Sequence, residues 1–343
     1  MKKYIALIVS VLLLVTMFAG CGDTAEPSID QNGEDTRVAI NVTAIAGPTG
    51  VGLVDLMQKQ TEGTTTNNYT FNVVTAPEQA VAAITNGTAD IAAVPTNVAA
   101  SLYKKTGGKV QVLAVNTTGV LHILANGESI QQVADLKGKT IYTTGKGANP
   151  EYILKYVLER NNLTPGKDVT VEFVADNDTL ATMMINGTAK IAMIPEPKAA
   201  AVLAQNQNVK RVLNMTTEWY KKDGKVPPAS ELDGFLLMGC VIARTEFVEQ
   251  NKQAINDFMA EYKTSIETVI ADVDTAAQLC ETYKVIPKAA IAKAAIPYCG
   301  LTYIDALDMR RYLHAYFNVL YSYDPTSIGG ELPGVGFYYY DKE

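Results

Sequence analysis

The sequence predicts an α/β protein made of two similar Rossmann-like lobes, and three observations support this fold class. A ten-residue phrase occurs twice, as NGTADIAAVP at residues 86–95 and as NGTAKIAMIP at residues 186–195. Each copy reads as the end of a helix, a short strand and the start of another helix, and such alternation gives a mostly parallel sheet. About three hundred residues follow the N-terminal segment, which is more than one hydrophobic core usually serves. Because a period of one hundred residues is too long for a solenoid, we expect two lobes.

Residues 1–21 have the pattern of a bacterial lipoprotein signal. Two lysines after Met1 precede an apolar run from Tyr4 to Ala19, which is shorter than a typical membrane-spanning helix. Ala19 and Gly20 before Cys21 resemble a lipobox, in which the cysteine is acylated, for example with palmitate. We therefore expect a lipid anchor at Cys21 that holds the protein on the extracytoplasmic face of the bacterial cell membrane. A plain cleaved signal, with Cys21 removed or idle, is the alternative.

The composition of the remaining chain indicates which class of protein it forms. Residues 22–35 carry acids, glycine and proline but almost no large apolar side chain, which predicts a flexible tether. The net charge is -7 and no block of basic residues occurs, so a nucleic-acid partner is not expected. Hydrophobic residues at 48% and charged residues at 19% are typical of a soluble globular protein.

The repeated phrase predicts the same elements in each lobe. Residues 75–78 have the form of a capping box, so a helix should start there, and Gly87 should end it. A strand at 89–94 should follow, up to a proline. The second copy predicts a helix at 176–186 and a strand at 190–194.

A glycine-bearing turn also connects a strand to a helix in each predicted lobe. In the first lobe, a strand at 37–43 leads through the turn at 47–50 into a helix. In the second lobe, a strand at 139–144 leads through the turn at 145–149 into a helix with Pro150 at its start. Both turns deliver a helix N-terminus to the carboxyl end of a strand, where ligands of open α/β sheets bind.

The signal with its lipobox, the GPTG turn, TNGTADIAAVP, SIQQVADLKGKTIYTTGKG and INGTAKIAMIPEP together resemble the substrate-binding lipoproteins of ABC importers in the nitrate, sulfonate, taurine and thiamine-precursor class. The resemblance implies the type II periplasmic-binding-protein fold, in which a two-strand hinge joins two lobes that close on a ligand. It implies a first lobe at 36–116 plus 242–343 and a second lobe at 117–241. It also implies a monomer that needs no cofactor and delivers a small molecule to an ABC permease.

The two turns and the resemblance together predict the ligand contacts, since residues after each strand face the cleft. The expected ligand-binding residues are Thr49, Gly50, Thr96, Asn97, Gly147, Ala148, Asn149 and Glu196. Backbone N–H groups at helix starts suit an anionic or acceptor-rich group, whereas Glu196 favours an amine or a ring N–H. We therefore expect an amine- or N–H-bearing sulfonate or heterocycle. Helix-capping roles for Thr96, Asn97 and Glu196 are the alternatives.

The sequence lacks the common catalytic motifs. His122 and His314 are the two histidines, and neither G-x-S-x-G nor H-E-x-x-H occurs. We therefore expect a binding protein and not an enzyme; the alternatives are an extracellular sensor with the same fold and an enzyme of the thiamine-pyrimidine type. Trp219 either stacks on a ligand ring or packs within the second lobe. Cys280 and Cys299 either form a disulfide or remain buried thiols.

Overall fold

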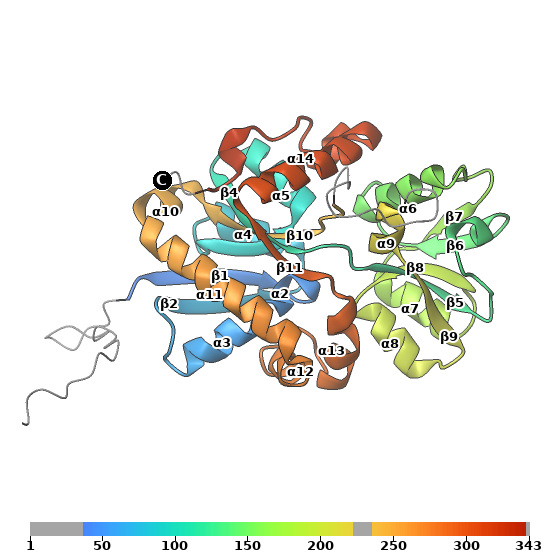
Figure 1. Cartoon of the computed structure of the whole chain (residues 1–343), viewed down its shortest axis with the longest axis horizontal. Coiled ribbons are helices and arrows are strands. Elements are labelled where there is room, and N and C mark those ends of the chain that lie inside the picture. The colour runs from blue at the N-terminus through green and yellow to red at the C-terminus, as the bar shows by residue number, and fades with distance from the viewer. Residues whose placement is uncertain (1–36, 222–234, 341–343) are drawn as a thin grey trace, which may run out of the picture. The chain divides into compact units, whose positions relative to one another are not determined.

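Two β-sheets, each with helices packed on it, form the two lobes of the protein (Figure 1). The computed structural model describes residues 37–221 and 235–340. The first lobe holds a six-stranded sheet in the order β11-β4-β10-β3-β1-β2, and the second a five-stranded sheet in the order β7-β6-β8-β5-β9. The predicted fold class, two α/β lobes, is confirmed. The strands are β1 Ala39–Ile45, β2 Asn68–Val74, β3 Ile91–Pro95, β4 Val110–Thr117, β5 Leu121–Asn126, β6 Thr140–Thr143, β7 Thr170–Phe173, β8 Ile191–Pro195, β9 Val209–Asn214, β10 Gly239–Arg244 and β11 Leu301–Asp305.

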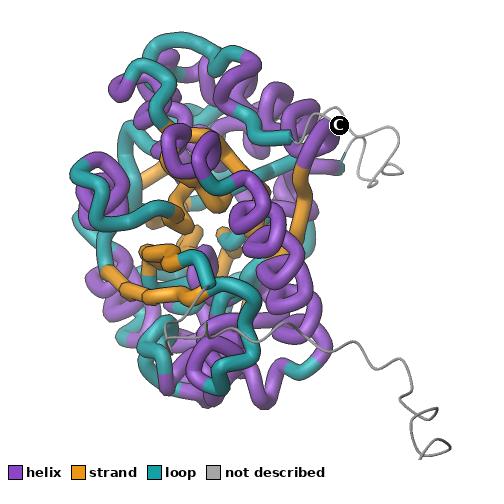
Figure 2. Tube along the Cα trace, turned by 90° about the vertical axis from the view of Figure 1, so that its left-hand side faces the viewer, coloured by secondary structure: helices purple, strands orange, loops and turns teal. Residues whose placement is uncertain are grey.

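Helices surround the strands, which lie in the interior (Figure 2). The α-helices are α2 Pro48–Val51, α3 Val54–Thr61, α4 Pro77–Thr85, α5 Thr96–Thr106, α6 Asn149–Arg160, α7 Asn177–Ile185, α8 Lys198–Gln205, α9 Met215–Tyr220, α10 Thr245–Gln250, α11 Lys252–Ala271, α12 Val273–Thr282, α13 Ala289–Ala295 and α14 Ala306–Tyr323. The 3-10 helices are η1 Val133–Leu136, η3 Ile296–Tyr298, η4 Pro325–Ile328 and η5 Val335–Phe337. Within the described ranges, no helix has both the length and the hydropathy to cross a membrane. The predicted signal, Cys21 and the predicted tether lie outside the described residues.

Both sheets are mixed, whereas the sequence predicted mostly parallel ones. β1 pairs in parallel with β2 and β3, but β10 is antiparallel to β3 and β4. In the second sheet β6 is parallel to β7 and β8, while β5 is antiparallel to β8 and β9. The physical reason is the passage of the chain between lobes. β5 and β10 each enter their sheet from the edge that faces the other lobe, so they run opposite to the strands that end at that edge.

The two copies of the repeated phrase form the same helix, turn and strand in the two lobes. α4 and α7 end before Gly87 and Gly187, whose φ angles of +80° and +77° are left-handed and suit glycine. Asp176 caps α7 by accepting a hydrogen bond from the Thr179 amide at 2.7 Å. The predicted capping box at 75–78 is wrong, because α4 starts one residue later. Its cap is the Gln79 side chain, which accepts from the Ala76 amide at 3.1 Å.

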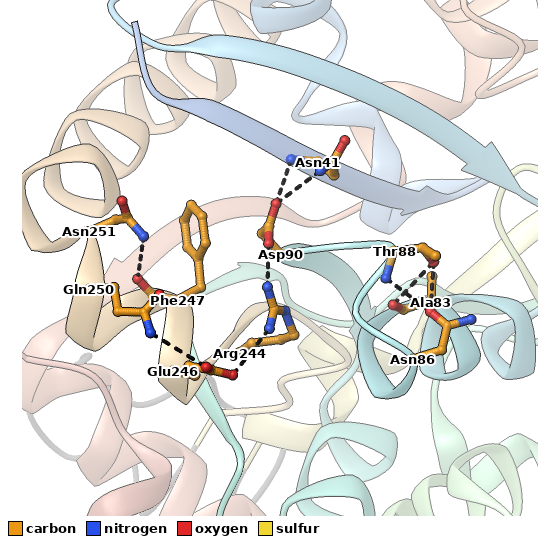
Figure 3. A network of polar contacts seen from close by, with 10 residues as sticks. All are labelled: Asn41, Ala83, Asn86, Thr88, Asp90, Arg244, Glu246, Phe247, Gln250 and Asn251. Carbon is orange, nitrogen blue, oxygen red and sulfur yellow. Dashed lines mark hydrogen bonds and ion pairs between the residues drawn. The ribbon is translucent and has the colours of Figure 1, made fainter.

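One charged position distinguishes the copies, and the structure explains it. Asp90 of the first copy is buried at 6% exposure. Its carboxylate accepts from the Asn41 amide at 2.9 Å and from Arg244 at 2.7 Å, as Figure 3 shows. Arg244 ends β10, the neighbour of β3, so the ion pair joins adjacent strands. The second copy has Lys190 at this position, and that residue is exposed.

The first predicted turn leads into two helices where one was expected. α2 ends at Val51 and α3 begins at Val54. Gly52 lies between them, and a Cβ atom at that position would approach the Ile266 side chain to 2.7 Å. This close approach lets α11, which carries Ile266, pack tightly against the start of the first lobe.

Candidate functional site

Residues from both lobes line a pocket of about 300 Å³, here called the cleft pocket. Its lining comes from the start of α2, the junction of β3 and α5, the two links between the sheets, and the start of α6. The lining residues are Pro48, Thr49, Pro95, Asn97, Val98, Thr117, Val120, Ala148, Asn149, Pro150 and Met238. Among the described residues, the lining includes four polar side chains and no charged one, so this part of the pocket offers a ligand neutral groups and apolar contact.

Four of the eight predicted ligand-binding residues line this pocket, namely Thr49, Asn97, Ala148 and Asn149. Sequence reasoning found three of them because both turns end at a helix start beside the carboxyl end of a strand, and it found Asn97 because that residue follows the first copy of the repeated phrase. It did not find Thr117, Val120 and Met238, which come from the links between the sheets. Such residues carry no local motif, and their position depends on which strands cross between lobes.

Three other predicted residues lie outside the lining and have roles in the protein itself. A Cβ atom on Gly50 would lie 2.7 Å from the Ile45 carbonyl oxygen, so glycine permits a close backbone approach. The buried Thr96 hydroxyl donates to the Leu237 carbonyl at 2.6 Å. The Gly147 amide donates to the Glu151 carboxylate at 2.6 Å. Ligand contact by these three residues stays a prediction.

Asn149 is the polar residue most directly placed for a ligand. It is the first residue of α6, after Ala148 as the N-cap residue and before Pro150. Its Nδ2 donates to Asn97 Oδ1 at 3.0 Å, a hydrogen bond that joins the second lobe to the first. The residue is only 5% exposed, and its Oδ1 has no hydrogen-bond partner among the described residues. A buried acceptor without a donor is costly, which indicates that a donor belongs there.

Glu196, the remaining predicted residue, is 2% exposed and does not line the cleft pocket. Its Oε1 pairs with the Arg211 guanidinium, and its Oε2 accepts from the Ala200 amide at 3.1 Å. Burial raises the pKa of Glu196, and the positive charge of Arg211 offsets part of that rise. The hydrogen bond from the Ala200 amide shows Glu196 in the helix-capping role that was the alternative. Ligand contact by Glu196 stays a prediction.

His122 completes this buried group on the strand between those of Glu196 and Arg211. Its Nε2 lies 4.0 Å from Glu196 Oε1 and 3.2 Å from the Tyr298 carbonyl oxygen. Burial lowers the pKa of His122 to about 4, so the imidazole is neutral at pH 7. The buried Nδ1 has no hydrogen-bond partner among the described residues. Sequence reasoning missed Arg211, because the order β8-β5-β9 that brings the three residues together cannot be read from the chain.

The first lobe covers this group through η3. The ring of Tyr298 stacks on Arg211, with the guanidinium carbon 3.6 Å from the ring centroid. The rings of His122 and Tyr298 are perpendicular and meet edge-to-face at a centroid distance of 5.7 Å. Arg211 is therefore held between a carboxylate of its own lobe and an aromatic face of the other lobe.

A further contact between the lobes joins α14 to α6. The Tyr152 hydroxyl donates to Asp324 at 2.9 Å, and the Tyr323 hydroxyl donates to Glu159 at 2.5 Å. Trp219 stacks on Tyr156 at a centroid distance of 4.0 Å and meets Tyr316 of α14 edge-on at 5.7 Å. Trp219 thus packs between the lobes and does not line the cleft pocket.

The described cysteines are free and buried, namely Cys240, Cys280 and Cys299. Burial raises the pKa of Cys280 to about 12, and it also raises the pKa of Cys240 and Cys299. Of the two alternatives left open for Cys280 and Cys299, the structure shows buried thiols. Within the described ranges no group of three or more His, Cys, Asp or Glu residues could hold a metal ion.

The comparison with known proteins agrees with this geometry. A sequence model of the family described as "ABC transporter, phosphonate, periplasmic substrate-binding protein" matches residues 51–225, which is 175 of the 343 residues. No curated protein matches the chain.

Solved structures of similar fold cover most of the chain. An ABC transporter protein from Parabacteroides distasonis has a TM-score of 0.74 at 18% identity, over 89% of this chain and 100% of its own. The periplasmic aliphatic sulphonate binding protein SsuA from Escherichia coli has a TM-score of 0.64 at 14% identity, over 89% and 93%. The periplasmic nitrate-binding protein NrtA from Synechocystis has a TM-score of 0.51 at 11% identity, over 80% and 74%. At these identities the likeness shows the fold.

Proposed function

Because the chain belongs to the family of periplasmic substrate-binding proteins of phosphonate-type ABC transporters, we propose that it captures a small organic molecule in the cleft pocket and passes it to an ABC permease. Membership of this family implies that the protein acts outside the cytoplasm. The pocket volume of about 300 Å³ lies at the lower end of the range for ligand sites and suits a small ligand.

The observation that supports the proposal most directly is the hydrogen bonding of the Asn149 carboxamide. One half of its carboxamide bonds the lobes together through Asn97, while the other half presents a buried, unpartnered oxygen beside the pocket. A ligand that donates an N–H to this oxygen satisfies it and adds a contact that exists only while both lobes surround the ligand. Ligand capture and lobe closure are then linked through one side chain.

We propose an N–H-bearing sulfonate or heterocycle as the ligand. Neutral donors at the pocket can hold a sulfonate, whose single charge is spread over three oxygens, without a lysine or arginine in the lining. The N–H part of this proposal is supported by Asn149 Oδ1 and not by Glu196, whose two oxygens already have partners in the protein.

We also propose that Cys21 carries the lipid that anchors the protein, as a monomer, to the extracytoplasmic face of the cell membrane. Cells grown with labelled palmitate should yield a labelled protein, and the Cys21→Ala variant should be unlabelled. Equal labelling of both proteins would contradict this anchor.

The ligand proposal is tested by calorimetry with two probes of similar size, taurine, which bears an amine, and propanesulfonate, which has no N–H. Asn149→Ala should weaken taurine binding about tenfold, the scale of one buried hydrogen bond, and should weaken propanesulfonate binding less. Asn318→Ala, on the exposed face of α14, is the matched control and should change neither affinity. Equal losses for both probes would contradict donation to Asn149 Oδ1.

A further inference from the structure

A second hollow, of about 360 Å³, lies on the first lobe between α4 and α5 and is here called the α4–α5 groove. Val81, Ala82, Val98 and Leu102 give it apolar walls. Asn97 stands at one end and Lys105 at the other, both on α5. The groove is open to the outside.

The groove lies next to the cleft pocket, because Asn97 and Val98 line both hollows. α4 and α5 each start after a strand that ends at the cleft edge, so both helices lead away from the cleft. From Asn97 to Lys105 the groove follows α5 for eight residues, which is about 12 Å at 1.5 Å per residue. A molecule whose head lies in the cleft pocket can therefore extend along α5 without leaving the protein surface.

The charges at the two ends of the groove differ in a way that orients such a molecule. Glu78, at the start of α4, lines the end of the groove near the cleft and repels the terminal anion of an extension from that end. Lys105 lines the far end, and within the described ranges no hydrogen bond or ion pair involves its amine. The neighbouring Lys104 differs, because its amine pairs with Glu331 at 2.6 Å. Among the described residues, Lys105 is thus a cation without an ion-pair partner at the far end of the α4–α5 groove.

We propose that the α4–α5 groove is a second subsite for the same ligand, which takes an aliphatic extension that ends in a carboxylate or a similar anion. The head stays in the cleft pocket against Asn149, the chain lies along Val81, Val98 and Leu102, and the terminal anion pairs with Lys105. A span of about 12 Å corresponds to a chain of roughly ten bonds. This inference rests on the proposed function, since it takes the head group from the cleft pocket.

The test uses three amides of taurine as probes in calorimetry with the purified protein. N-acetyltaurine fills only the cleft, N-octanoyltaurine adds an apolar chain, and N-suberoyltaurine adds a chain of the same length that ends in a carboxylate. N-octanoyltaurine should bind at least about tenfold more tightly than N-acetyltaurine, because six added methylenes are each partly removed from water. N-suberoyltaurine should bind more tightly still.

Two variants assign these gains to the groove. Ala82→Trp places a large side chain in the groove and should bring the affinity of the octanoyl probe down to that of the acetyl probe. Because both affinities are measured on the same protein, partial unfolding lowers them equally and leaves their ratio unchanged. Lys105→Ala should lower the affinity for N-suberoyltaurine about threefold to tenfold relative to N-octanoyltaurine, the scale of an exposed or half-buried charge pair. Lys104→Ala, the matched control, should leave that ratio unchanged.

The outcomes separate the groove from the proposed function. If N-acetyltaurine binds and the longer probes bind no more tightly, the groove subsite is wrong while the cleft proposal stands. If the octanoyl gain persists in Ala82→Trp, the chain lies elsewhere and the groove is again wrong. If none of the three probes binds, the proposed ligand head fails, and the subsite fails with it.

Discussion

The buried His122 makes the stability of this protein sensitive to pH, and the structure gives the sign and the size of the effect. The imidazole is fully buried, and burial lowers its pKa to about 4 from the ordinary value of 6.5. Between these two values the unfolded chain binds a proton at His122 that the folded protein does not bind. The free energy of unfolding therefore falls as the pH falls from about 6.5 to about 4. A difference of 2.5 pKa units corresponds to about 3 kcal/mol.

Other groups titrate in the same range, so the measurement has to isolate His122. Burial raises the pKa of Glu196, which stabilises the folded protein as the pH falls and opposes the effect of His122. The comparison of wild type with His122→Gln removes this term, because Glu196 is present in both proteins. His314→Gln, on the exposed face of α14, is the matched control.

The assay is urea unfolding between pH 4 and pH 7.5, followed by circular dichroism and by the fluorescence of Trp219. The single tryptophan packs at the contact between the lobes, so agreement of the two signals tests whether the lobes unfold together. Wild type should lose about 3 kcal/mol more than His122→Gln across this range, and His314→Gln should follow wild type. Parallel profiles for wild type and His122→Gln would refute the reasoning, since His122 would then titrate alike in the folded and unfolded states.

Four further predictions follow from contacts outside the pocket. Arg211→Leu leaves the buried Glu196 carboxylate without its cation and should cost about 3–5 kcal/mol of unfolding free energy, measured in urea. Adding Glu196→Gln to this variant should restore part of the loss. If the double variant instead loses the sum of the two single losses, a direct ion pair is contradicted. Asp90→Ala should cost about 3 kcal/mol of unfolding free energy, because the contacts to Arg244 and Asn41 are lost. Lys190→Ala, which changes the exposed residue at the same position of the second copy, should cost less than about 0.5 kcal/mol, and equal costs would refute the assignment. Cys240, Cys280 and Cys299 should resist a thiol-specific reagent in the native protein and react once it is unfolded, and rapid native reaction would show that they are accessible. Tyr152→Phe should weaken taurine binding in calorimetry by a few fold, because it removes the hydrogen bond to Asp324 that joins the two lobes. Unchanged affinity would mean that this contact persists in the open protein.

The elements that the sequence predicted correctly depend on local patterns. The repeated phrase predicted α4, α7, β3 and β8, because helix-ending glycines and strand-ending prolines act within a few residues of where they stand. The turns at 47–50 and 145–149 predicted helix starts at the cleft, and through them Thr49, Ala148 and Asn149 of the pocket lining. Asn97 of the lining was predicted because it follows the first copy of the repeated phrase. The capping box at 75–78 failed by one residue, since Gln79 competes for the same amides.

The features that could not be predicted depend on which strands become neighbours. Arg211 meets Glu196 only because β5 lies between β8 and β9, and Arg244 meets Asp90 only because β10 returns beside β3. Neither order leaves a mark at the residues themselves. For the same reason the sequence predicted Glu196 as a ligand contact or a helix cap, without the ion pair to Arg211 that the structure shows beside the Ala200 hydrogen bond.

The contacts between the lobes bear directly on ligand affinity. Asn149 and Tyr152 both belong to α6, so the helix that meets Asn97 at the cleft also meets α14 through Asp324. A motion that separates Asn149 from Asn97 therefore has to move α6 along α14 as well. Every contact made only while the lobes are together lowers the free energy of the closed protein and raises the fraction that is ready to hold a ligand. If the ligand binds in the cleft pocket as proposed, its affinity is set partly by Tyr152 and Tyr323, which do not line that pocket.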